Sequence, residues 1–132
     1  MNAMNIRVTG LVFVAIIVAG APGLQAQTVD LSGVWTFTVT TDTGVTYPEV
    51  MLEQDGLSLT GNYSSDALGK SPVSGHLRGS EMTFMFSTDV GGGQMTPVVY
   101  TGTLQDDGAI VGTMDIGGGL LLGTFTAARS EL

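Results

Sequence analysis

The side chains that could act as acids, bases or nucleophiles are few and stand far apart in this sequence. The chain has one histidine, His76, and no cysteine. A catalytic triad needs a base beside its nucleophile, and a zinc site needs several converging ligands. Since the alternation around His76 and Arg78 points both side chains to solvent, we interpret His76 as a surface residue. We therefore expect no catalytic residue, no metal site and no cofactor.

The carboxylates follow a pattern that is typical of turns. An aspartate in a turn can hydrogen-bond its own backbone and stabilise the bend, and none of these loops has the ligand spacing of a calcium loop. Glu49 and Glu53 lie opposite the apolar Val50 and Leu52 on a predicted strand, which turns this carboxylate pair toward solvent. We assign the turn role to Asp42, Asp55, Asp89, Asp106 and Asp107.

The elements that would have to position any functional group are short strands built on one repeated pattern. An apolar residue, a glycine and a large apolar residue alternate, as in Leu59-Thr60-Gly61-Asn62-Tyr63. Because strand side chains alternate between two faces, these three lie on one face. The glycine suits a sharply coiled strand, where it either makes room for a ligand or lets large neighbours interdigitate. The pattern recurs at 31–35, 73–77, 100–104, 110–114 and 121–125.

Eight such strands recur about every twelve residues, joined by turns rich in aspartate and glycine, with no helical period between them. We therefore predict an all-β fold, an eight-stranded antiparallel up-and-down β-barrel. Its first strand spans Asp30 to Thr41. The second, Val45 to Gln54, contains Pro48, which cannot donate to a ladder and indicates an edge or a bulge. A longer polar segment, Ser64 to Pro72, is predicted as a loop that is either simply solvated or closes over a barrel mouth.

The first 26 residues read as a secretory signal rather than as part of this barrel. Arg7 gives a positive start, Leu11 to Ala19 forms an apolar run, and Ala26 offers a small residue before the cut. The run is too short for a spanning helix. We expect residues 1–26 to be a signal peptide and residues 27–132 to be a single domain that is exported to the periplasm or the extracellular space.

The charge of the chain excludes some classes of partner. Its formal net charge is −8, with four basic residues against twelve acidic ones. Binding of nucleic acid needs a basic surface that neutralises phosphates, and an anionic membrane surface would repel the chain for the same reason. Threonine on the outward face of the strands also favours a soluble barrel over one embedded in a membrane. We expect neither a nucleic acid nor a membrane as partner.

Residues in the first and the last predicted strand resemble a known signature. Gly33-Val34-Trp35 in the first strand, with Arg129 at the end of the last, is similar to the signature of the calycin superfamily, which includes lipocalins, fatty-acid-binding proteins and avidins. The resemblance implies a calycin-like barrel in which Trp35 closes one end and Arg129 packs over it. A guanidinium over an indole ring is a favourable contact of about 1 kcal/mol. The strand pattern also resembles small secreted bacterial domains of unknown function, which implies no activity.

The third strand resembles that of avidins in particular. There a tyrosine and a serine two residues later bind the ureido oxygen of biotin, and the matching positions are Tyr63 and Ser65. The rest of that site is absent, because Phe37 stands where avidins have asparagine and the chain has a single tryptophan. Biotin is therefore not the expected ligand.

The inward face is the remaining candidate for a function. Eight-stranded barrels are either filled by side chains or hold one small ligand. Our leading hypothesis is a non-catalytic, secreted binding module for a small hydrophobic ligand, with Tyr63 and Tyr100 as the polar contacts. An enzyme that uses Tyr63 or His76 as a proton donor is a further alternative. The predicted ligand-binding residues are Trp35, Phe37, Tyr63, Ser65, Phe84, Tyr100 and Phe125.

An apolar patch on the outward face supports a rival hypothesis. Such surface often marks an interface, although scattered β-branched residues that suit a strand account for it equally well. Here a filled barrel would act as a structural or protein-interaction domain, forming a homo-oligomer through its first strand and its sixth to eighth strands. The predicted patch consists of Val34, Met95, Val99, Val111, Leu120 and Leu122.

Overall fold

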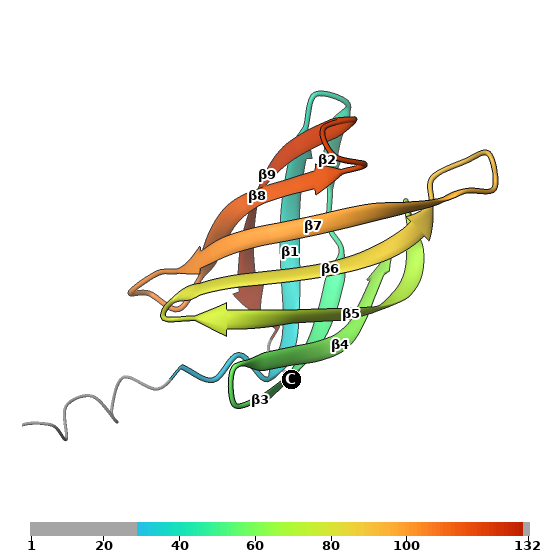
Figure 1. The fold of residues 1–132 in the computed structure, drawn as a ribbon. Helices are drawn as coiled ribbons and strands as arrows, with labels where there is room; N and C mark the ends of the chain where they lie inside the picture. Colours follow the sequence, from blue (N-terminus) through green and yellow to red (C-terminus); the bar gives the residue numbers. More distant parts are fainter. Residues whose placement is uncertain (1–28, 131–132) are drawn as a thin grey trace, which may run out of the picture.

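The computed structural model describes residues 29–130, and these form β-strands joined by turns (Figure 1). The predicted signal peptide lies outside the described residues. No helix in the described range is long and apolar enough to cross a membrane. The strands are β1 (Gly33–Thr41), β2 (Gly44–Thr46), β3 (Glu49–Asp55), β4 (Ser58–Ser65), β5 (Gly69–Arg78), β6 (Glu81–Asp89), β7 (Met95–Leu104), β8 (Ile110–Ile116) and β9 (Leu121–Arg129).

The strands close into an antiparallel barrel of eight, with β2 as a short addition to β1. From β3 to β9 each strand pairs with the next along the chain, and β9 returns to pair with β1 (Figure 1). The closing register sets Trp35 opposite Arg129 and Val39 opposite Phe125. The predicted fold class, an all-β, eight-stranded, up-and-down barrel, is confirmed. Because the connections alternate between the two ends, we distinguish a Trp35 end from a Ser65 end.

The predicted second strand is divided at Pro48. β2 and β3 both pair with β1 in one continuous register, with Thr46 opposite Val39 and Val50 opposite Trp35. Between them the carbonyl of Pro48 still accepts a hydrogen bond from the Phe37 N–H at 2.9 Å. Proline has no N–H to return, so the ladder is interrupted there.

The loop predicted between Ser64 and Pro72 is a tight turn instead. Ser65 pairs with Gly69, and Asn62 pairs with Pro72, so only three residues separate β4 from β5. The polar residues that suggested a loop belong to both faces of β5, with Lys70 exposed and Ser71 buried. Gly69 allows the reversal because it adopts a φ of +75°, which other residues rarely adopt.

The inward positions of all eight barrel strands form one core. Two glycines show how it packs: a Cβ on Gly75 would lie 1.9 Å from the Thr83 carbonyl oxygen, and a Cβ on Gly102 would lie 2.8 Å from Phe125 Cζ. These glycines let strands and large side chains approach closely, which answers the question that the sequence left open. The largest fully buried side chains include Trp35, Tyr100, Phe37, Phe84, Leu31, Leu52, Leu59, Met82 and Ile110.

Candidate ligand-binding interior

Aromatic side chains from five strands fill the middle of the barrel. The Phe37 ring contacts those of Phe84, Tyr100 and Phe125, with centroids 5.9, 5.5 and 5.0 Å away. Phe84 also stacks on Tyr100 at 4.9 Å. Edge-to-face and offset arrangements at these separations are favourable. The four rings come from β1, β6, β7 and β9. Together they form a packed layer that fills the centre of the barrel at this height.

A second aromatic layer lies nearer the Ser65 end. Tyr63 stacks on Phe86 with centroids 4.2 Å apart, and Tyr63 lies 6.2 Å from Tyr100 in the first layer. Tyr63 and Tyr100 are 2% and 1% exposed. Burial raises the pKa of Tyr100 well above its ordinary value, and the neighbouring Tyr63 hydroxyl adds to this. The Tyr100 phenol is therefore a neutral hydrogen-bond donor inside an apolar barrel.

The hydrogen bonding of these two hydroxyls is incomplete. Each phenol carries one O–H donor and can also accept. Within residues 29–130, neither hydroxyl bonds to a backbone carbonyl or to a side chain other than its tyrosine neighbour. If one O–H donates to the other oxygen, the second O–H has no acceptor. A buried donor without an acceptor costs about 1–3 kcal/mol.

The Trp35 end of the barrel is sealed. The guanidinium carbon of Arg129 lies 4.6 Å from the centroid of the Trp35 ring, and the Trp35 indole N–H donates to the Leu31 carbonyl at 2.9 Å. Arg129 also donates to the backbone carbonyls of Asp30 and Ser32. This is the arrangement that the calycin resemblance implied.

The Asp30 carboxylate accepts hydrogen bonds from Ser32 at this end of the barrel. These bonds hold the pKa of Asp30 below its ordinary value, with a smaller contribution from the charge of Arg129. The Gln54 amide continues the seal on the neighbouring strand, since it donates to the Val29 carbonyl at 2.7 Å and accepts from the Leu31 N–H at 2.8 Å. A ligand could not enter through this end without breaking these bonds.

The Ser65 end is lined by small polar side chains. The Thr88 hydroxyl donates to the Leu68 carbonyl at 2.9 Å, and the Ser71 hydroxyl contacts the Ser87 carbonyl at 3.4 Å. Ser65 itself is the last residue of β4, where its Oγ accepts the Leu68 N–H at 2.9 Å. Ser65 is partly exposed and is engaged in stabilising the turn.

The structure places the predicted ligand-binding residues in four positions. Phe37, Phe84, Tyr100 and Phe125 form the first layer, and Tyr63 joins it from the second. Trp35 lies at the sealed end and Ser65 at the rim of the other.

Sequence reasoning left three neighbours out of the candidate site. Phe86 stacks directly on Tyr63, while Ser71 and Thr88 are 8% and 6% exposed. The alternation that continues inward from Phe84 through Phe86 to Thr88 is the signal that could have included two of them.

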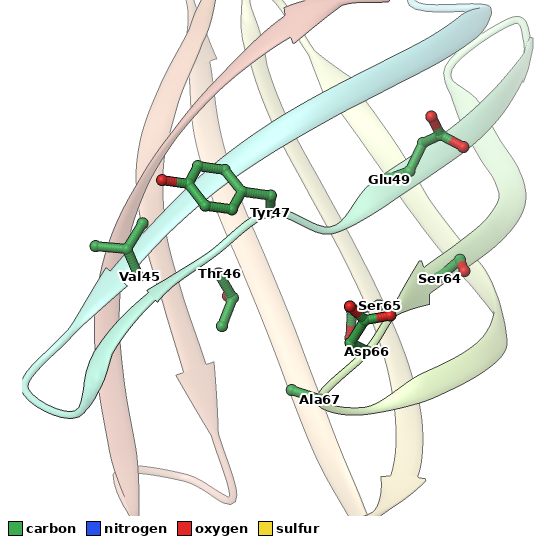
Figure 2. Close-up of a pocket in the computed structure, with 8 residues that line it drawn as sticks. All are labelled: Val45, Thr46, Tyr47, Glu49, Ser64, Ser65, Asp66 and Ala67. Atoms are coloured by element: carbon green, nitrogen blue, oxygen red, sulfur yellow. The ribbon is translucent and has the colours of Figure 1, made fainter.

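A slot opens in the barrel wall near the Ser65 end, where β2 and the turn after β4 diverge. It has a volume of about 610 Å³ and opens to the surface. Figure 2 shows Val45, Thr46 and Tyr47 on one side and Ser65, Asp66 and Ala67 on the other, with Glu49 and Ser64 where the two sides meet. The wall parts here because the β3–β4 ladder ends at the pair Glu49 and Ser64.

The other predicted surface residues are distributed as follows. His76 is exposed on β5 between Ser58 and Thr83 of the adjacent strands. Glu49 and Glu53 are exposed on β3 as predicted. Within residues 29–130, no three His, Asp or Glu side chains gather where they could hold a metal ion.

The outward apolar patch is broken in the structure. Val111 is 37% and Leu122 62% exposed on adjacent strands, but the exposed side chains of Thr113 and Thr124 pair between them. Leu120 lies in the turn before β9, which corrects the prediction that it points outward from a strand. Val34 and Val99 are only partly exposed, and Met95 lies at the far end of β7.

Comparison with known proteins supports the fold. No protein-family model matches the sequence, and a search of curated proteins finds no match. Among solved structures, the chain is similar to EF1p2_mFAP2b, whose structure was determined bound to DFHBI. The match covers 76% of this chain and 94% of that one, with a TM-score of 0.53 and 10% sequence identity. At this identity the similarity shows the fold alone, a closed, calycin-like antiparallel barrel.

Proposed function

We propose that this chain is an exported, non-catalytic binding module that takes a small, largely apolar molecule into its barrel from the Ser65 end. The observation that carries the proposal is the buried pair of hydroxyls on Tyr63 and Tyr100. The pair leaves one O–H donor without an acceptor in an apolar interior. A ligand that brings one hydrogen-bond acceptor recovers the cost of that donor, which gives it an affinity that a pure hydrocarbon lacks.

The packing of the interior limits the size and the path of such a ligand. The Trp35 end is sealed by Arg129, so entry is through the Ser65 end. There the stacked rings of Tyr63 and Phe86 are the first large side chains that an entering molecule meets. One of these rings must turn aside, and the ligand takes its place in the aromatic stack. This favours a flat ligand of about one or two rings.

Two further observations support the proposal. The structurally similar EF1p2_mFAP2b binds DFHBI, so a barrel of this fold is compatible with a small-molecule ligand. The candidate proton donor His76 is exposed on β5, outside the barrel interior.

Native mass spectrometry of the protein purified from the exported fraction of its host tests this function. We expect a bound mass that is lost under denaturing conditions and is strongly reduced in a Tyr63→Phe/Tyr100→Phe double variant. The same spectra test the export, since cleavage after Ala26 leaves a chain that begins at Gln27. A bare monomer in both proteins, or a bound mass that the double variant retains fully, would contradict the proposal.

The second candidate is a filled barrel that acts as a structural or interaction domain. The observation that favours it is the exposure of Val111 and Leu122 on neighbouring strands β8 and β9. In the same spectra, a ligand-free multimer that a Leu122→Ser substitution dissociates would shift the assignment to this surface.

A further inference from the structure

Among the strands within residues 29–130, β2 is the one that has a single partner strand. Every other strand in this range pairs on both sides, whereas β2 pairs only with β1. The register fixes which of its backbone groups are free. Phe37 and Pro48 form a hydrogen-bonded pair, and hydrogen-bonded pairs alternate with non-bonded ones along an antiparallel ladder. Thr46 therefore bonds to β1, and the N–H and C=O groups of Val45 and Tyr47 point away from it, toward the slot.

The opposite side of the slot leaves this edge uncovered. If the β3–β4 ladder continued past Glu49 and Ser64, Asp66 would lie opposite Tyr47. The chain instead turns back at that point, because Ser65 already pairs with Gly69 in the hairpin to β5. The β4–β5 turn therefore parts from β2 and leaves the space of about 610 Å³ between them (Figure 2). An added strand lies about 4.8 Å from its neighbour, and a groove of this volume accommodates a short one.

The side chains around the edge indicate the chemistry of the occupant. Glu49 and Asp66 are both exposed at the slot, and Tyr47 is 69% exposed beside them. Lys70, opposite Ser64 on β5, is the nearest basic residue by register, so the acidic groups outnumber it. A second copy of this acidic chain would bring the same carboxylates to the same place, and repulsion disfavours that pairing.

We propose that the Val45–Tyr47 edge binds a short extended peptide with basic side chains, which adds one strand to the barrel wall. Backbone hydrogen bonds to Val45 and Tyr47 supply the attachment, and Glu49 and Asp66 select lysine or arginine at alternate positions. β2 is three residues long and Pro48 ends its free edge, so the edge accepts a few residues only. This site is separate from the interior and does not rest on the ligand proposed for it.

The test uses the protein expressed from its full sequence and a fluorescently labelled eight-residue peptide of alternating lysine and valine. Fluorescence anisotropy should show saturable binding, and NMR should show the largest shifts at the amides of Val45 and Tyr47. Two control peptides separate the contributions: one has glutamate in place of lysine, and one carries N-methyl groups on alternate backbone nitrogens. We expect the first not to bind and the second to bind at least about tenfold more weakly.

Matched variants test the two carboxylates. A Glu49→Gln/Asp66→Asn double variant should bind about tenfold more weakly, since an exposed ion pair contributes up to about fivefold. Glu53→Gln, on the same face of β3 but outside the slot, should bind as the wild type does. The proposal is overturned if no binding is seen up to about 1 mM peptide, if the N-methylated peptide binds equally well, or if Glu53→Gln matches the double variant. Tyr63→Phe/Tyr100→Phe should leave this peptide affinity unchanged, so failure here is distinguishable from failure of the interior site.

Discussion

The Arg129 guanidinium lies over the Trp35 ring, 4.6 Å from its centroid, and joins the last described strand to the first. The two residues are also partners in the β1–β9 ladder that closes the barrel. The contact thus stands at the seam of the barrel, on the end through which no ligand enters. Its energetic contribution is separable from that of the ladder, because the ladder uses backbone atoms only.

Replacement of Arg129 should therefore lower stability without opening the barrel. Arg129→Ala removes the contact with Trp35 and the hydrogen bonds to the Asp30 and Ser32 carbonyls. Because Arg129 is exposed, we expect a loss of about 1–2 kcal/mol in the free energy of unfolding. Urea denaturation measures it, and Arg129→Lys, which keeps the charge but not the planar fork, should lie between. A variant within about 0.3 kcal/mol of the wild type would show that the contact is not stabilising.

A methyl group on Gly75 should be far more damaging. The new Cβ would lie 1.9 Å from the Thr83 carbonyl oxygen and 2.6 Å from Phe84 Cα, and both are backbone atoms that cannot move aside independently. We expect Gly75→Ala to cost about 3 kcal/mol or more. Thermal unfolding followed by circular dichroism checks this, with Ser74→Ala, an exposed outward neighbour, as the control. Equal midpoints for the two variants would mean that β5 and β6 can separate at this crossing.

The sequence predicted which side chains face into the barrel and which face out, because this depends on local alternation. The period of two placed Phe37 and Tyr63 inward and Glu49 and Glu53 outward, and the structure agrees. The contact between Trp35 and Arg129, by contrast, was implied by the calycin resemblance, and the structure agrees. An inward or outward assignment needs only the alternation within one strand, and half-buried strands show this alternation directly in the sequence.

The features that sequence reasoning missed depend on how one strand is staggered against another. Pro48 indicated an interruption of the strand. The free edge at Val45, however, follows from where the β3–β4 ladder ends, which depends on how these two strands pair. The proximity of Tyr63 and Tyr100 is likewise set across the barrel, since β4 and β7 do not pair. The turn at Asp66 was hidden because its flanking strands are polar on their outward faces, as a loop also would be.

The buried phenol of Tyr100 should make the barrel sensitive to alkaline pH. Its pKa in the folded protein is raised above the ordinary value of 10.0, chiefly by burial. The unfolded chain therefore releases this proton above about pH 10 while the folded chain keeps it, so stability is full below that pH and falls as the pH rises. The slope is about 1.4 kcal/mol per pH unit. Urea titrations at pH 9 and pH 11 should show a smaller fall in Tyr100→Phe, and an equal fall would place the alkaline sensitivity on other groups.

The paired tyrosines should separate stability from binding. The Tyr63→Phe/Tyr100→Phe double variant removes both hydroxyls together and leaves no donor unsatisfied, while the stacked rings keep their contacts with Phe86 and Phe84. Replacing both partners of a buried polar pair is close to neutral or stabilising, so we expect the free energy of unfolding of the ligand-free protein to stay within about 1 kcal/mol of the wild type or to rise.

Binding of the interior ligand should respond in the opposite direction, since its acceptor loses both donors. We expect its affinity to fall about tenfold, by roughly the 1.4 kcal/mol of one hydrogen bond. A single Tyr63→Phe variant serves as the control, because Tyr100 then keeps its donor for the ligand. If the double variant were instead destabilised by about 2 kcal/mol or more, the two hydroxyls would be fully satisfied within the protein. The tyrosine pair would then be a structural element of a filled barrel.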